Sequence, residues 1–143
     1  MPGERETGAL PPGLVPGLEG VASVRVTEER TAAAAASGAL PVFGTPFLLA
    51  LMEEAAFNAT APHLGPGQST VGTAVELRHL APTPTGLTVT ARARLVRVEG
   101  RRLLFEVEAE DGFERVGEAR HERYVVDVPR FLERAARKAG GPA

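Results

Sequence analysis

The second half of the chain alternates apolar and polar residues in four segments separated by short turns. These segments are residues 71–79, 87–95, 103–109 and 115–127. Alternation with period two is typical of half-buried β-strands, and turns of hairpin length make neighbouring strands antiparallel. The alternation slips at Leu95 and Val96, which predicts a β-bulge there. Residues 21–27 alternate in the same way and predict a further strand near the N-terminus.

Between these strand segments, the apolar residues from Thr45 to about Thr60 follow a helical period instead. The stripe consists of Leu48, Met52, Ala55 and Ala59, with Leu49 and Ala56 beside it. We predict Thr45 as the N-cap, Pro46 as the first helical residue and Pro62 as the residue that closes the helix. The preceding alanine-rich run can form no more than a helical turn, because Gly38 and Pro41 interrupt it.

One long helix and an antiparallel sheet predict an α+β fold in which the curved sheet wraps around one central helix, the hotdog arrangement. We expect an irregular N-terminal arm over residues 1–19, the domain over 20–128 and a short C-terminal helix or tail over 129–143. A single helix leaves one sheet edge uncovered. We therefore expect a homodimer or a larger homo-oligomer.

Composition excludes several classes of function. The 143 residues carry a net charge of −2, which gives no electrostatic footprint for nucleic acid or an anionic membrane. There is no cysteine, so disulfides, thiol nucleophiles and thiolate metal sites are excluded. No apolar run reaches the roughly 20 residues of a membrane helix, and the N-terminus lacks the pattern of a signal peptide. We expect a cytoplasmic protein.

Three polar residues in apolar surroundings are the candidates for chemistry: Thr45, Glu53 and His79. A hydroxyl, a carboxylate and an imidazole can together transfer an acyl group to water. Each also has a structural interpretation. Thr45 can simply cap the helix, Glu53 can be a surface carboxylate at the flank of the apolar stripe, and His79 can be a structural histidine on the core side of its strand. His63 and His121 are read as structural or exposed.

Other site classes find no support in the sequence. It contains no phosphate-binding loop, no Rossmann glycine pattern and no metal-ligand spacing, so we expect neither a metal nor a cofactor. Gly72 marks either a bulge or a close approach of the backbone to a ligand.

The runs GTPFLLALMEEAA, STVGTAVELRHLAPTPTG and EVEAEDGFERVGEARHERYVVD resemble the fluoroacetyl-CoA thioesterase-like family of hotdog proteins over roughly residues 20–128. The resemblance implies a catalytic triad of Thr45, Glu53 and His79, with Gly72 lining the acyl site. It also implies an acyl-CoA substrate bound along a dimer groove.

One departure from the family concerns the segment before Thr45. The resemblance implies bulky aromatic lid residues there, yet the lid positions correspond to Ala36 and Ala39, and Phe43 is the one aromatic residue of the stretch. We expect Phe43 to contact the acyl group and Arg120 or Arg123 to contact CoA phosphates. The predicted function is hydrolysis of a small or medium acyl-CoA, with Glu53 as nucleophile or as base. The alternatives are a non-catalytic acyl-CoA-binding or regulatory module and a hydratase, whose Asp/His pattern is missing.

Overall fold

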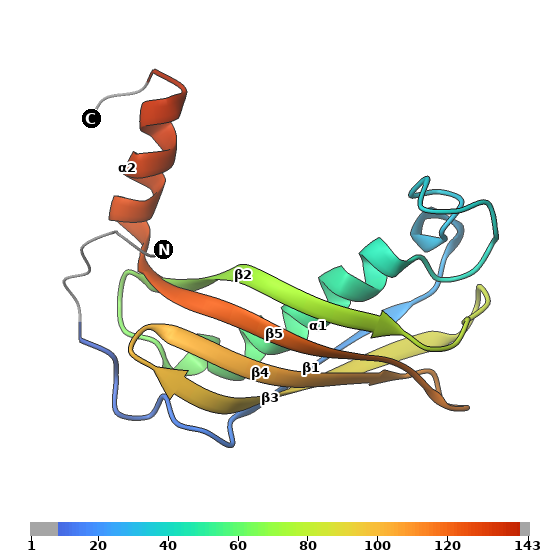
Figure 1. Cartoon of the computed structure of the whole chain (residues 1–143), viewed down its shortest axis with the longest axis horizontal. Helices are drawn as coiled ribbons and strands as arrows, with labels where there is room; N and C mark the ends of the chain where they lie inside the picture. The colour runs from blue at the N-terminus through green and yellow to red at the C-terminus, as the bar shows by residue number, and fades with distance from the viewer. Residues whose placement is uncertain (1–8, 141–143) are drawn as a thin grey trace.

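A computed structural model describes residues 9–140 of the chain. Its regular elements follow the order strand, helix, four strands, helix (Figure 1). They are β1 (Glu19–Arg25), α1 (Thr45–Thr60), β2 (Gln68–His79), β3 (Thr88–Glu99), β4 (Arg102–Glu110), β5 (Arg115–Asp127) and α2 (Val128–Lys138), with short 3-10 turns at Glu28–Arg30 and Ala61–His63. Residues 1–8 of the expected N-terminal arm lie outside the described residues, and residues 9–18 contain no helix or strand.

The five strands form one antiparallel sheet in the order β1-β3-β4-β5-β2. The sheet curves around α1, as Figure 1 shows, which confirms the hotdog arrangement. The bulge expected at Leu95 and Val96 is present, because the β3–β4 register shifts between Leu95 and Arg97. A second shift, between Gly72 and Ala74, interrupts the pairing of β2 with β5. Strand β2 is the last strand in the sheet order, so its outer edge is unpaired among the described residues.

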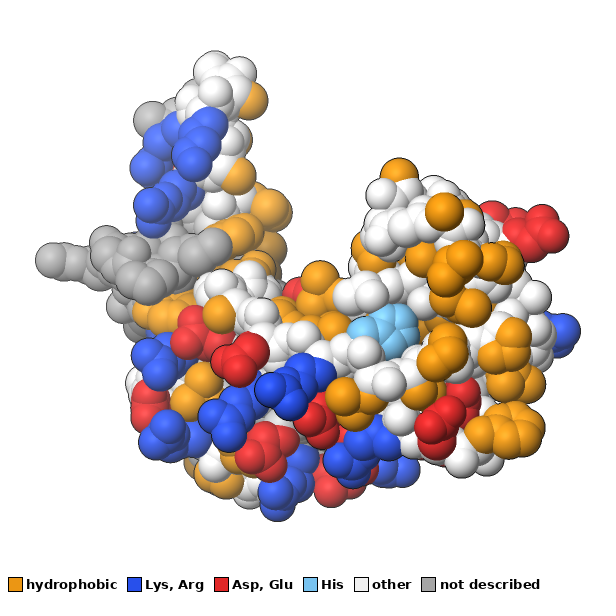
Figure 2. Space-filling model, turned by 45° about the vertical axis from the view of Figure 1, so that its right-hand side comes forward, with side chains coloured by type: hydrophobic (Ala, Val, Ile, Leu, Met, Phe, Trp, Pro, Cys, Tyr) orange, Lys and Arg blue, Asp and Glu red, His pale blue; other side chains and the backbone are white. Residues whose placement is uncertain are grey.

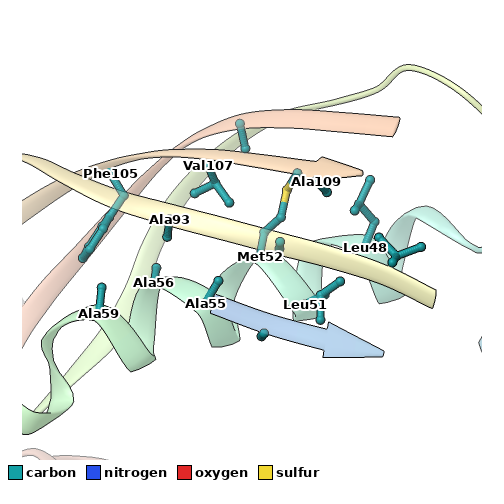
Figure 3. Close-up of a cluster of buried hydrophobic side chains, with 14 of the residues drawn as sticks. Leu48, Leu51, Met52, Ala55, Ala56, Ala59, Ala93, Phe105, Val107 and Ala109 are labelled. Atoms are coloured by element: carbon teal, nitrogen blue, oxygen red, sulfur yellow. The ribbon is translucent and has the colours of Figure 1, made fainter. Parts of the chain in front are cut away.

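The core lies between α1 and the concave face of the sheet (Figure 3). From the helix it takes Leu48, Leu51, Met52, Ala55, Ala56 and Ala59, and from β3 and β4 it takes Ala93, Leu95, Leu103, Phe105, Val107 and Ala109. The alanines of the helix let it approach the sheet closely, and the larger leucines and Met52 fill the space at its N-terminal half. This packing fixes the direction of α1 and hence the positions of Thr45 and Glu53. Neither α1 nor α2 is long and apolar enough to cross a membrane.

The segment between β1 and α1, residues 31–44, forms a turn-rich loop at the N-terminal end of the helix. An isolated bridge between Thr31 and Phe43 closes the loop at its base, and a second bridge, from Val42 to Pro84, ties it to the body. Ala36 adopts a left-handed conformation with φ 55°. The alanine run thus forms turns rather than a helix, in agreement with the interrupted pattern.

Candidate active site

Thr45 is the first residue of α1, not its N-cap, so the predicted capping role is wrong. Gly44 occupies the cap position, and no side chain caps the helix. The amides of Phe47 and Leu48 donate instead to the Gly44 carbonyl. The Thr45 side chain is therefore free to serve another partner, and its hydroxyl oxygen lies 2.8 Å from Nδ1 of His79.

His79 reaches Thr45 because it is the last residue of β2 and belongs to the face of the strand that looks toward α1. The pair joins positions 34 residues apart in the sequence. Its Nε2 atom is buried and has no hydrogen-bond partner among residues 9–140. Burial lowers the pKa of His79 below its ordinary value of 6.5. The imidazole is thus neutral near pH 7 and is able to accept a proton from a hydroxyl.

A hollow of about 350 Å³ opens beside this pair. Its lining is made of small or apolar side chains together with the two polar ones: Ala32, Ser37, Val42, Phe43, Thr45, His79, Leu80, Ala81 and Pro82. Phe43, expected to contact the acyl group, lines this hollow, although its side chain is otherwise buried in the core. The N-terminus of α1 at Thr45 adds positive potential that favours a developing oxyanion.

Glu53 lies elsewhere. It is eight residues after Thr45 on α1, or about 12 Å along the helix axis. Its carboxylate faces the middle of β2, where a Cβ at position 72 would collide with Oε2, so Gly72 leaves room for the carboxylate in this position. Nη1 of Arg123 lies 3.4 Å from Oε2 of Glu53. Within one chain, the structure brings Thr45 and His79 together but leaves Glu53 apart from them.

Arg123 holds Glu53 from the core side and is itself held firmly. Its side chain is 8% exposed. Nε donates to the Thr70 hydroxyl at 2.9 Å, Nη2 to the Thr70 carbonyl at 3.0 Å, and Nη1 lies 3.2 Å from Nε2 of His121. Burial lowers the pKa of Arg123, whereas the carboxylate of Glu53 opposes that change. The guanidinium thus carries a fixed positive charge toward Glu53.

His121 is a structural member of this network, as expected. Its Nδ1 lies 2.9 Å from the carbonyl oxygen of Ala74, which can only accept, so Nδ1 carries the proton. Nε2 then accepts from Arg123. Burial is the main cause that lowers the pKa of His121, and the neutral ring is consistent with both contacts.

Arg120 points to the opposite side of the sheet from α1. It is exposed and lines a groove of about 620 Å³ on the outer face, among Glu76, Arg78, Arg94, Glu106 and Glu118. Opposite charges alternate there, and part of this mixture of red and blue side chains is visible in Figure 2. Arg120 and the Thr45–His79 pair thus occupy different faces of one chain.

The sequence reasoning proposed Arg123 only as a phosphate contact and missed its buried role. The sequence did contain a signal for this role. Alternate residues of β5 lie on one face of the strand, and the apolar members of this set identify it as the face toward the core: Ala119, His121, Arg123 and Val125. Two basic side chains on an inward face indicate a buried polar network. No group of three or more His, Cys, Asp or Glu residues in the described range 9–140 could hold a metal ion.

Comparison with known proteins places these observations in a family. A family model described as fluoroacetyl-CoA-specific thioesterase matches residues 26–129. The fluoroacetyl-CoA thioesterase of Streptantibioticus cattleyicolor is 46% identical over 97 residues, which cover 68% of this chain and 70% of that protein.

Solved structures agree with this match. A structure of the fluoroacetyl-CoA thioesterase FlK has a TM-score of 0.81 and 38% identity, and the match covers 88% of this chain and 98% of that one. A thioesterase superfamily member from Thermus thermophilus has a TM-score of 0.82 and 30% identity over 90% of this chain and 95% of its own. The chain therefore belongs to the fluoroacetyl-CoA-specific thioesterase family.

Proposed function

We propose that the protein is an acyl-CoA thioesterase that hydrolyses a small or medium acyl-CoA to the free acid and CoA. The observation that carries this proposal is the 2.8 Å contact between the Thr45 hydroxyl and Nδ1 of His79 at the wall of an acyl-sized hollow. The related enzyme from Streptantibioticus cattleyicolor bears the name of a thioesterase, which supports the same reaction class.

The chemistry follows from the protonation state of His79. In its neutral form the ring can carry its proton on Nε2 and accept the Thr45 proton at Nδ1. The hydroxyl oxygen, or a water at the same place, attacks the thioester carbonyl carbon as its proton moves to Nδ1. The C–S bond then breaks, and His79 returns the proton to the leaving CoA sulfur. If the attacking oxygen belongs to water, the free acid is formed directly. If it belongs to Thr45, the acyl ester on Thr45 is then hydrolysed by a water whose proton passes through His79 back to the Thr45 oxygen. The N-terminus of α1 stabilises the oxyanion in between.

Glu53 enters this scheme through a second subunit. Strand β2 is a sheet edge of 12 residues, long enough to pair with its own copy about a two-fold axis. If the axis passes between Val75 and Glu76, Gly72 of the partner subunit lies opposite His79. The carboxylate next to that glycine, the partner's Glu53, then faces the unpaired Nε2 of His79. In this role Glu53 supports the imidazole, or acts on the acyl group directly as nucleophile or base.

Hydrolysis is tested by measuring release of the free CoA thiol over a series of acyl-CoAs of increasing chain length. We expect release that depends on enzyme concentration for at least one short or medium chain. Binding of acyl-CoA without release of the thiol would favour the alternative, a non-catalytic acyl-CoA-binding module on the same fold.

The first prediction concerns assembly: the protein is a homodimer or larger at micromolar concentration. The long unpaired edge of β2 and the separation of Glu53 from His79 within one chain both support this prediction. Light scattering with size-exclusion chromatography measures the mass. A monomer close to the chain mass of 15.0 kDa contradicts the prediction and the shared site with it.

Substrate selectivity gives a second prediction: fluoroacetyl-CoA is not strongly preferred over acetyl-CoA. Ala36 and Ala39 are exposed residues of the loop before α1 and offer only methyl groups as a lid. One large apolar contact changes discrimination by roughly 1–3 kcal/mol, so the absence of several removes it. The ratio of kcat/KM for the two substrates, measured on one preparation, checks this. A ratio above about 1,000, or some 4 kcal/mol, places the source of selectivity elsewhere.

The third prediction is a pH profile. His79 must be unprotonated to accept a proton, and burial lowers its pKa below 6.5. We expect kcat/KM to be constant through neutral pH and to fall with acid only at a midpoint below 6.5. A midpoint above 6.5 would contradict the assignment.

The folding stability should also decrease as the pH falls. His79 and His121 both have a lowered pKa in the folded protein, so the unfolded chain takes up protons first as the pH falls below 6.5. The contribution that the two neutral rings make to stability is complete above 6.5 and is lost as the pH falls toward their folded-state values. The urea midpoint measured over this range should decrease.

A further inference from the structure

Helix α2 carries an apolar stripe that the described part of the chain covers only in part. Val128, Phe131, Leu132, Ala135 and Ala136 recur at helical spacing, and the remaining positions are mostly charged. None of the residues of α2 is buried, and the Leu132 side chain is 59% exposed. Figure 2 shows the stripe as the orange side of α2, turned toward an open gap, with the basic side chains facing away. An amphipathic helix of this kind ordinarily buries such a stripe against another element.

The acyl hollow and helix α2 lie at opposite ends of strand β2. Helix α2 follows directly on β5, where Asp127 pairs with Gln68, the first residue of β2. The hollow lies at His79, the last residue of β2, roughly 36 Å away for a strand of this length. Both α2 and the loop of residues 31–44 reach past the free edge of β2, at its opposite ends (Figure 1).

A two-fold axis through the middle of β2 exchanges these two ends. With the axis between Val75 and Glu76, antiparallel pairing sets the first residue of one strand just beyond the last residue of the other, next to residues 80–82 that line the hollow. The partner's α2 then stands beside the hollow of the first subunit. Such an interface is isologous, so a single contact between stripe and hollow would occur twice.

The surfaces that would meet are chemically alike. The hollow is rimmed by Leu80, which is 49% exposed, and the adjoining loop presents Leu40, which is 66% exposed. At the two lid positions of this loop, Ala36 and Ala39, the side chains are only methyl groups. We infer that the apolar stripe of α2, through Phe131 and Leu132, closes the acyl hollow of the partner subunit and contacts the distal part of the acyl chain. This inference rests on the proposed function and names its specificity-determining element.

Proximity can be tested without any activity, because the chain contains no cysteine. Two variants, Leu132→Cys and Leu80→Cys, are prepared separately, mixed until subunits exchange, and oxidised. We expect a disulfide-linked dimer on a non-reducing gel. The control mixes Leu132→Cys with Val21→Cys, since Val21 is 42% exposed on β1, the opposite edge of the sheet. Equal linkage to Val21→Cys, or linkage confined to pairs of Leu132→Cys, overturns the inference.

Substrate selectivity provides a second test, which measures activity. The double variant Phe131→Ala, Leu132→Ala should lose more activity on a longer acyl-CoA than on acetyl-CoA, whose acyl group is too short to reach the stripe. Its kcat/KM for hexanoyl-CoA should fall about tenfold relative to that for acetyl-CoA. Glu133→Ala, on the charged side of α2, is the control. An unchanged ratio in the double variant, with the dimer intact, overturns the inference.

Mixed dimers decide whether the contact is made in trans. The double variant is combined with His79→Ala, so that each mixed dimer retains one working imidazole, in the subunit whose own α2 is altered. If α2 acts in trans, that site is closed by an intact helix, and the wild-type ratio returns. The altered ratio in the mixed dimer contradicts the assignment. If the wild-type protein hydrolyses no acyl-CoA, the proposed function fails, whereas the cross-linking result still decides the inference.

Discussion

Replacement of His79 by alanine is expected to lower kcat/KM for the best acyl-CoA by about 10²- to 10⁴-fold, the range for loss of a general acid–base group. The reason is geometric. Its Nδ1 is the hydrogen-bond partner of the Thr45 hydroxyl, and the other ring nitrogen has none among the described residues. Without the imidazole, the attacking oxygen keeps its proton and the leaving sulfur receives none.

The matched control for this variant is His63→Ala. His63 lies in the short turn after α1, apart from the hollow, and its replacement should leave hydrolysis close to wild type. Circular dichroism and the urea midpoint verify that the His79 variant is folded. A folded His79→Ala protein that retains more than about a tenth of wild-type kcat/KM rules out His79 as the base.

Glu53→Gln is expected to lower turnover by at least about 100-fold. Glutamine keeps the size of the side chain and can still accept a hydrogen bond from Arg123, so the loss would reflect the missing charge. Glu54→Gln is the neighbouring control, because Glu54 is exposed and should have little effect. Near-wild-type hydrolysis by a folded Glu53→Gln protein removes Glu53 from the site.

Subunit mixing then separates a role in trans from a role in cis. A mixed dimer of Glu53→Gln and His79→Ala subunits contains one site with both residues intact only if Glu53 acts on the partner's His79. Mixing two nearly inactive preparations should therefore restore activity well above that of either alone. If Glu53 acts within its own chain, every site carries one defect and mixing restores nothing.

Local patterns were sufficient to predict most of the fold. The alternation of residues 71–79 identified the face of β2 that carries His79, and its slip at Leu95 and Val96 located a bulge that the β3–β4 register contains. The period of α1 located the helix from Thr45 to Thr60. These features depend on residues close in sequence, where a periodic pattern has a direct steric cause.

The site was less accessible to sequence reasoning because its contacts are distant in sequence. A threonine before proline predicts a cap equally well whether or not a histidine 34 residues away competes for its hydroxyl. The separation of Glu53 from this pair follows from the course of α1 along the sheet, which the residue types do not encode. Arg123 was predicted only as a contact to CoA phosphates, as an alternative to Arg120, because charge outweighed strand parity in that interpretation.

The unfilled N-cap of α1 limits how this protein can adapt to heat. Serine, asparagine or aspartate in place of glycine at an N-cap typically adds a few tenths of a kcal/mol to stability, and such small gains are usual targets of thermal selection. At Gly44 that gain is opposed, since a side chain there would begin 3.0–3.1 Å from the backbone of Ala32 and Thr31, which would have to shift by a few tenths of an ångström. Variants selected for survival at higher temperature should therefore accumulate away from the start of α1. The surroundings of the Thr45 hydroxyl would then remain unchanged in such variants.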